Sequence, residues 1–132
     1  MKKEIHILLV DDQPGYCEFL EMSSDIWNEH FSVMLTHVKS AEEAVSELQS
    51  MTPNIIVVDA HLPDTNTLDF VERYSVGESP IVVTSEEHSL SLEESAIYHG
   101  AAAYIPKTND PDEVEFFFAR LAELSSAPRE IH

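Results

Sequence analysis

Acidic, hydroxyl and amine side chains follow several strand-like segments of this 132-residue chain. They are Asp11 and Asp12 after one apolar run, Asp59 after another, Thr84 at the end of a third, and Lys107 shortly after a fourth. In an open parallel α/β sheet, the carboxyl ends of the strands meet at one edge, and ligands bind there. We therefore expect these side chains to share one pocket.

Three carboxylates at one edge repel one another unless a cation lies between them. Mg²⁺, or Mn²⁺ in its place, suits oxygen ligands, and Mg²⁺ is commonly bound by one or two carboxylates together with a substrate phosphate. We expect Asp12 and Asp59 to bind the ion directly. Asp11 is expected to hold it through water, and the backbone carbonyl of His61 to complete the protein ligands.

The chemistry that suits such a pocket is phosphoryl transfer. A carboxylate such as Asp59 can act as a nucleophile toward phosphorus when a metal neutralises charge on the transferring oxygens. Lys107 is expected to hold one phosphoryl oxygen as a point charge, and the Thr84 hydroxyl to donate a hydrogen bond to another.

Five strand-like segments alternate with helical patterns and must position these groups: residues 5–10, 31–38, 54–58, 80–84 and 101–105. Three of them are continuous in Ile, Val and Leu, which is typical of parallel strands buried on both faces. Repetition of strand and helix with right-handed crossovers predicts a doubly wound α/β domain. We expect this domain to occupy residues 1–125, and a C-terminal tail or linker stub to occupy 126–132.

Helix ends carry their own signals. Three helix starts are predicted by an N-cap or capping box: Ser40 with Glu43, Ser91 with Glu94, and Asp110 before Pro111. Gly100 is expected to end a helix. The last helix has an apolar stripe that is expected to pack on the sheet: Val114, Phe117, Phe118 and Leu121.

Composition excludes several classes of protein. Against 25 acidic residues stand only 7 Lys and Arg, so the net charge of −18 argues against nucleic-acid binding. No apolar run approaches the roughly 20 residues that span a bilayer, and we expect a cytoplasmic protein with no membrane contact. Cys17 is the only cysteine and is expected to be a small buried side chain.

The seven histidines do not have metal-ligand spacing. Six are expected to be structural or exposed: His6, His30, His37, His88, His99 and His132. The imidazole of His61 lies beside the expected site, where it is a candidate to modulate hydrolysis of an acyl phosphate.

Four segments together resemble the receiver domains of bacterial response regulators: Asp11-Asp12, residues 58–64, residues 81–85, and Tyr104-Ile105-Pro106-Lys107. The resemblance covers about residues 4 to 124 and implies a flavodoxin-like sheet with strand order 2-1-3-4-5. It implies a phosphoryl group on Asp59, donated by a phosphohistidine of a sensor histidine kinase or histidine phosphotransfer protein. Such a domain is not an enzyme beyond its own phosphorylation and slow dephosphorylation, and it signals to a downstream protein or output domain.

The resemblance also implies a switch. Thr84 moves toward the phosphoryl group and Tyr104 turns inward, and these movements reshape the surface of the fourth helix, fifth strand and fifth helix. Two positions depart from the usual pattern, because Thr67 stands where glycine is general and Thr108 where proline commonly follows the lysine. We therefore expect an altered loop after Asp59, and either a trans or a strained peptide bond after Lys107.

Three other functions compete with this interpretation. A degenerate receiver would act as an interaction module without being phosphorylated. An aspartyl-phosphate phosphatase would need a second aspartate two residues after its nucleophile, where this chain has His61. A flavin- or nucleotide-binding module would need a glycine-rich loop after the first strand, where this chain has Asp11 and Asp12.

Overall fold

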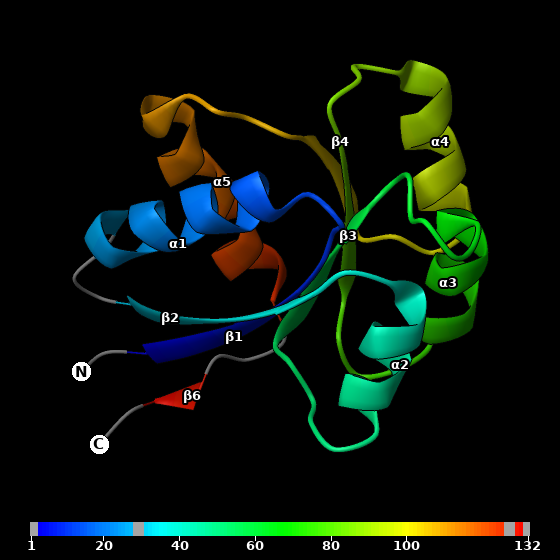
Figure 1. Cartoon of the computed structure of the whole chain (residues 1–132), viewed down its shortest axis with the longest axis horizontal. Helices are drawn as coiled ribbons and strands as arrows, with labels where there is room; N and C mark the ends of the chain where they lie inside the picture. The colour runs from blue at the N-terminus through cyan, green and yellow to red at the C-terminus, as the bar shows by residue number, and fades with distance from the viewer. Residues whose placement is uncertain (1–2, 28–30, 126–128, 131–132) are drawn as a thin grey trace.

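The described residues form a six-stranded sheet with helices packed against both faces (Figure 1). A computed structural model of the chain describes residues 3–27, 31–125 and 129–130. The elements, in order, are β1 (Lys3–Val10), α1 (Pro14–Trp27), β2 (Phe31–Val38), α2 (Ala41–Leu48), β3 (Ile55–Asp59), α3 (Thr67–Tyr74), β4 (Ile81–Ser85), α4 (Leu90–Tyr98), β5 (Ala103–Pro106), α5 (Pro111–Leu124) and β6 (Arg129–Glu130). The five predicted strands are confirmed, with small differences at their ends.

Strands β1 to β5 run parallel in the order β2-β1-β3-β4-β5. Helices α1 and α5 cover one face of the sheet, and α2, α3 and α4 cover the other (Figure 1). This arrangement confirms the doubly wound α/β fold and the predicted strand order. Because β1 and β3 are neighbours, the residues that follow them emerge side by side at one edge of the sheet.

Alternate residues of the central strands point into two separate apolar cores. Val58 and Val83 face the side of α2, α3 and α4, where they join Phe70. The opposite core contains the predicted stripe of the last helix, whose four residues are all buried: Val114, Phe117, Phe118 and Leu121. Cys17 is buried in the same core, as expected, whereas Phe116 on the outer side of α5 is 78% exposed.

Helix caps confirm two of the three predicted starts. The Ser40 side chain accepts a hydrogen bond from the backbone of Glu43, and the Asp110 side chain accepts one from the backbone of Asp112. Gly100 has φ 114°, a left-handed value that favours glycine, and it lies just after α4. The backbone N–H groups of residues 100 and 101 then bond the last carbonyls of the helix.

The capping box predicted at Ser91 and Glu94 is wrong. Helix α4 begins at Leu90, and the cap is Ser89, whose backbone is extended and whose side chain accepts the Leu92 N–H at 3.1 Å. A serine hydroxyl caps a helix without help from a glutamate three residues later, so the helix begins before the predicted box.

A short sixth strand follows the last helix. Arg129 and Glu130 pair in antiparallel fashion with Glu4 and Lys3 at the start of β1. Nothing in the sequence indicated this pairing within the expected tail, of which residues 126–128 and 131–132 lie outside the described part. None of the described helices is both long and apolar enough to cross a membrane.

Candidate functional site

Three carboxylates converge where β1 and β3 end. Asp11 and Asp12 follow β1 directly, and Asp59 is the last residue of β3. One oxygen from each lies within 4.8 Å of the others. Asp11 and Asp59 are buried, whereas Asp12 is exposed, so the cluster opens to solvent on one side. The predicted convergence of these acids is therefore present.

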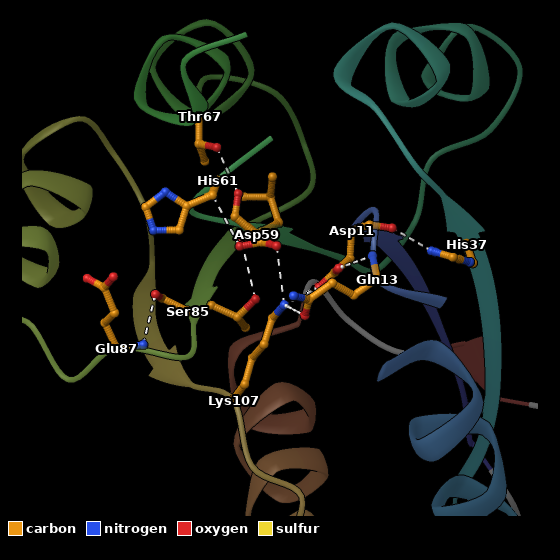
Figure 2. A network of polar contacts seen from close by, with 11 residues as sticks. Asp11, Gln13, His37, Asp59, His61, Thr67, Ser85, Glu87 and Lys107 are labelled. Atoms are coloured by element: carbon orange, nitrogen blue, oxygen red, sulfur yellow. Dashed lines mark hydrogen bonds and ion pairs between the residues drawn. The ribbon is translucent and has the colours of Figure 1, made fainter. Parts of the chain in front are cut away.

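Lys107 reaches this cluster from the loop after β5 (Figure 2). Its ammonium nitrogen lies 2.7 Å from Asp11 Oδ2 and 3.2 Å from Asp59 Oδ2. It also donates a hydrogen bond to Gln13 Oε1 at 2.9 Å, and it lies 4.8 Å from the centre of the Tyr16 ring. The side chain is only 6% exposed, so its charge balances buried acid charge rather than a surface pair.

Burial shapes the protonation of two groups in the site. Burial raises the pKa of the Asp11 carboxyl. Hydrogen bonds from Lys107 and from the Gln13 backbone partly offset this rise. Burial, with the charges of Asp11 and Asp59, also raises the pKa of the Tyr16 hydroxyl. The site therefore disfavours further negative charge, and added positive charge is favourable there.

Asp59 is held at three of its atoms (Figure 2). Carboxylate Oδ1 accepts the backbone N–H of His61 at 3.1 Å, and Oδ2 faces Lys107. The backbone carbonyl accepts a hydrogen bond from the Thr67 hydroxyl at 2.7 Å. These contacts limit the freedom of the carboxylate before any ligand binds.

The loop between Asp59 and Thr67 turns without glycine. Asn66 caps α3 from an extended backbone, with φ −77° and ψ 121°, and its side chain accepts the Leu68 N–H. No non-glycine residue in the described ranges has positive φ. The loop after Asp59 is thus built from ordinary backbone conformations, and Thr67 at its end is buried.

Asp64 ties this loop to another helix. Its two carboxylate oxygens accept the backbone N–H groups of Ala41 and Glu42, each at 3.0 Å, at the start of α2. Burial alone would raise the pKa of Asp64, but these hydrogen bonds outweigh it and hold the pKa below its ordinary value. The loop after β3 is therefore attached to the N-terminus of α2.

Thr84 and Ser85 end β4 beside Asp59. The Thr84 side chain is fully buried, and its hydroxyl points to the Val58 carbonyl at 3.4 Å rather than into the open pocket. Ser85 lines the pocket, and its side-chain oxygen accepts the Glu87 N–H at 3.1 Å (Figure 2). Thr84 must therefore change partner to contact a phosphoryl group.

Two further features concern the position of the Tyr104 ring and the peptide bond after Lys107. The Tyr104 ring is buried, and its hydroxyl donates to the backbone carbonyl of Glu87. The ring thus already lies inward. The Lys107–Thr108 peptide bond is trans, which is the first of the two expected outcomes.

The end of β2 has a contact that no pattern in the sequence indicated. The Nε2 atom of His37 lies 2.6 Å from the backbone carbonyl of Asp11. The placement of β2 beside β1 in the sheet was the signal that could have revealed it. His61 is exposed, His6 contacts Thr36, and His30 and His132 lie outside the described residues.

An open cavity of about 290 Å³ adjoins the acids and is lined by Asp12, Asp59, His61 and Lys107 among others. Three carboxylate oxygens at short mutual distances form a donor set that fits a hard divalent cation. The cavity has room beside them for a small anionic group.

Known proteins resemble this chain. The family model for the response regulator receiver domain matches residues 7–116. Protein-glutamate methylesterase/protein-glutamine glutaminase 2 of Paramagnetospirillum magneticum is 33% identical over 113 residues, which are 81% of this chain and 31% of that protein. The transcriptional regulatory protein TrcR of Mycobacterium tuberculosis is 27% identical over 122 residues, which are 91% of this chain and 45% of that protein.

A solved structure has the same fold. The phosphorylated cyanobacterial phytochrome response regulator RcpA superposes with a TM-score of 0.77 at 16% identity, over 98% of this chain and 100% of that chain. The present chain spans less than half the length of the two curated relatives.

Proposed function

We propose that this chain, which belongs to the family of response regulator receiver domains, accepts a phosphoryl group on Asp59. The observation that carries the proposal is the convergence of three carboxylates with Lys107 around one open cavity. The elements that supply them are far apart in sequence, and only the sheet order brings them together.

A divalent cation belongs to this proposal. Receiver domains bind such an ion in an acidic pocket, and Asp11, Asp12 and Asp59 offer the oxygen donors here. The backbone carbonyl of His61 is the proposed fourth group. When bound, Mg²⁺ or Mn²⁺ would neutralise charge on the transferring phosphoryl oxygens.

The proposed step transfers phosphorus from nitrogen to oxygen. Asp59 forms a P–O bond as the P–N bond to a partner's phosphohistidine breaks, and the imidazole keeps the bonding electrons. Lys107 would move from the carboxylates toward one phosphoryl oxygen. The Thr84 hydroxyl would leave the Val58 carbonyl and donate to a second phosphoryl oxygen. The chain would catalyse only this reaction and the slow return to free aspartate.

The proposed signal is a change of the surface formed by α4, β5 and α5. A groove of about 590 Å³ lies along β5 and α5, and its lining includes Tyr104, Pro106, Phe116 and Arg120. A change in the hydrogen bond between Tyr104 and Glu87 would connect the pocket to this groove. We propose Thr84 and Tyr104 as the switch residues, with the favoured state set by phosphoryl contacts.

The proposed partners are a sensor histidine kinase or histidine phosphotransfer protein upstream, and an output domain or downstream protein. A cytoplasmic location is part of the same proposal. No direct contact with nucleic acid is proposed, because a net charge of −18 opposes binding to phosphates.

Mass spectrometry after incubation with acetyl phosphate and Mg²⁺ tests the proposal. Wild-type protein is expected to gain one adduct of about 80 Da, and Asp59→Asn none. Glu72→Gln, which alters an exposed carboxylate on α3, is the matched control and should be labelled like wild type.

The outcomes separate the competing functions. An adduct that persists in Asp59→Asn would show that another residue is the acceptor. A wild-type protein that takes no adduct from acetyl phosphate or from phosphorylated kinases would support a phosphorylation-independent interaction module. Sustained release of phosphate from an aryl phosphate would instead indicate a phosphatase.

A further inference from the structure

Thr67 makes an unusual contact with the backbone of Asp59. Its hydroxyl donates to the Asp59 carbonyl at 2.7 Å, and its side chain lies among buried groups, with the residue only 3% exposed. Thr67 is also the first residue of α3. One side chain thus joins the end of β3 to the start of the helix that follows it.

The carbonyl that accepts this bond is next to the carboxylate on which the proposed chemistry depends. When a buried carbonyl loses its hydrogen-bond donor, the free energy of the folded state rises, and the backbone near it shifts to recover a partner. A shift at the Asp59 carbonyl would rotate the peptide unit and the carboxylate with it. The contacts at Oδ1 from His61 and at Oδ2 from Lys107 do not constrain the carbonyl itself.

We infer that Thr67 is a positioning residue, which sets the orientation of the Asp59 carboxylate toward metal and phosphoryl donor through the backbone carbonyl. The inference rests on the proposed function of Asp59. It assigns a role to a departure from the resembling domains, in which glycine at this position has no hydroxyl to donate. The threonine thus adds a hydrogen bond that holds the acceptor residue from behind.

A purely structural role makes a different prediction from a positioning role. If the hydroxyl only stabilises the loop, its removal lowers the melting temperature and leaves the site of the folded protein unchanged. If it positions Asp59, its removal also weakens Mg²⁺ binding and slows labelling of the folded protein. Loss of a group that hydrogen-bonds and orients a metal ligand lowers metal affinity or activity by roughly 10- to 100-fold.

Thr67→Val tests the role by removing the hydroxyl while the shape is kept. Thr67→Ser retains the hydroxyl, and Thr65→Val removes an exposed hydroxyl from the same loop as a matched control. The first readout is the ¹³C chemical shift of the Asp59 carbonyl, which reports the hydrogen bond directly. The second is Mg²⁺ affinity by NMR titration below the unfolding temperature, and the third is the rate of labelling by acetyl phosphate at saturating Mg²⁺.

Thr67→Val is expected to move the carbonyl shift, weaken Mg²⁺ binding about tenfold and slow labelling about tenfold. Thr67→Ser and Thr65→Val should match wild type in all three measurements. Wild-type affinity and labelling in Thr67→Val would overturn the inference, and so would an equal loss in Thr67→Ser. If the valine variant does not fold, Thr67→Ala removes the same hydroxyl without a branched side chain, and the same outcomes decide.

The test separates this inference from the proposed function. Metal affinity and the carbonyl shift are measured on unphosphorylated protein. A wild-type protein that binds Mg²⁺ but takes no adduct would contradict phosphorylation at Asp59, while the variants would still show whether Thr67 orients its carboxylate.

Discussion

The loops that follow β3 and β5 lie at the same edge of the sheet, and each leads into a helix, yet they are attached to the rest of the molecule differently. In the loop after β3, Asp64 accepts two backbone N–H groups of α2, and the Thr67 hydroxyl binds the Asp59 carbonyl. In the loop after β5, the ammonium of Lys107 reaches the carboxylates of Asp11, which follows β1, and of Asp59, which ends β3.

From this difference we expect one part of the site to stay in place and the other to move when a cation binds. The Asp64 attachment of the β3 loop ends on backbone N–H groups at the start of α2, which are not part of the acidic cluster, so its strength should not depend on bound metal or phosphate. The attachment of the β5 loop depends on uncompensated acid charge, which a bound cation would reduce. Metal binding is therefore expected to release Lys107 for a phosphoryl oxygen while the loop that holds Asp59 stays in place.

The largest expected effect comes from Lys107→Met. Removal of the ammonium leaves Asp11 and Asp59 facing each other without a buried counter-charge, so the free energy of unfolding should fall by about 3 kcal/mol in EDTA. Mg²⁺ should recover much of that loss, because it binds the same carboxylates in the folded state. Urea denaturation with EDTA and with Mg²⁺ measures both quantities.

A surface ion pair provides the control for Lys107→Met. Arg120 pairs with Glu123 at 3.2 Å, and both side chains are more than half exposed. Arg120→Met should therefore change the free energy of unfolding by less than about 0.5 kcal/mol, with or without Mg²⁺. An equal loss for Lys107→Met in EDTA and in Mg²⁺ would contradict the idea that the lysine substitutes for a cation.

A smaller effect is expected from Asp64→Ala in the fixed loop. The variant loses the acceptor for two N–H groups at the start of α2, so the free energy of unfolding should fall by about 1 kcal/mol. Unlike the loss in Lys107→Met, this loss should be the same in EDTA and in Mg²⁺. A loss that Mg²⁺ reverses would show that the two loops are not distinct.

The same carboxylate predicts a direction for pH. The pKa of Asp64 is lowered in the folded state from an ordinary value of 3.8. The folded state therefore binds this proton less readily than the unfolded state, and the stabilisation is present above pH 3.8 and is lost as pH falls through the folded pKa. Urea denaturation of wild type and Asp64→Ala between pH 6 and pH 2.5, a range of about 3.5 pH units, should show that their difference in free energy of unfolding shrinks at the acid end.

The fold could be predicted because its signals are local and repeated. Continuous apolar runs mark the buried strands, and the stripe from Val114 to Leu121 marks the face of α5 that packs on the sheet. The cap of α4 could not be assigned, because Ser89 and Ser91 both precede apolar and acidic residues and only the backbone geometry chooses between them. The pairing of β6 depends on a contact with the far end of the chain and left no local pattern.

The candidate site was predictable where strand ends alone determine which side chains meet. Asp11 and Asp12 follow β1, Asp59 ends β3 and Lys107 follows β5, and the strand order puts these three ends at one edge of the sheet. The contacts around them were not predictable, since they depend on side-chain directions: His37 at the Asp11 carbonyl, Gln13 and Tyr16 at Lys107, and Thr67 at the Asp59 carbonyl.

The smallest expected effect distinguishes the two threonines. The Thr108 hydroxyl donates to Glu113 at 2.7 Å and accepts the Asp110 N–H at 3.0 Å, so its partners belong to the start of α5. These exposed bonds contribute little, and Thr108→Val should lower the free energy of unfolding by about 0.5 kcal/mol while the labelling rate and Mg²⁺ affinity remain those of wild type. If Thr108→Val slowed labelling as much as Thr67→Val, the loss would not be specific to the hydrogen bond at the Asp59 carbonyl, and a positioning role for Thr67 would be contradicted.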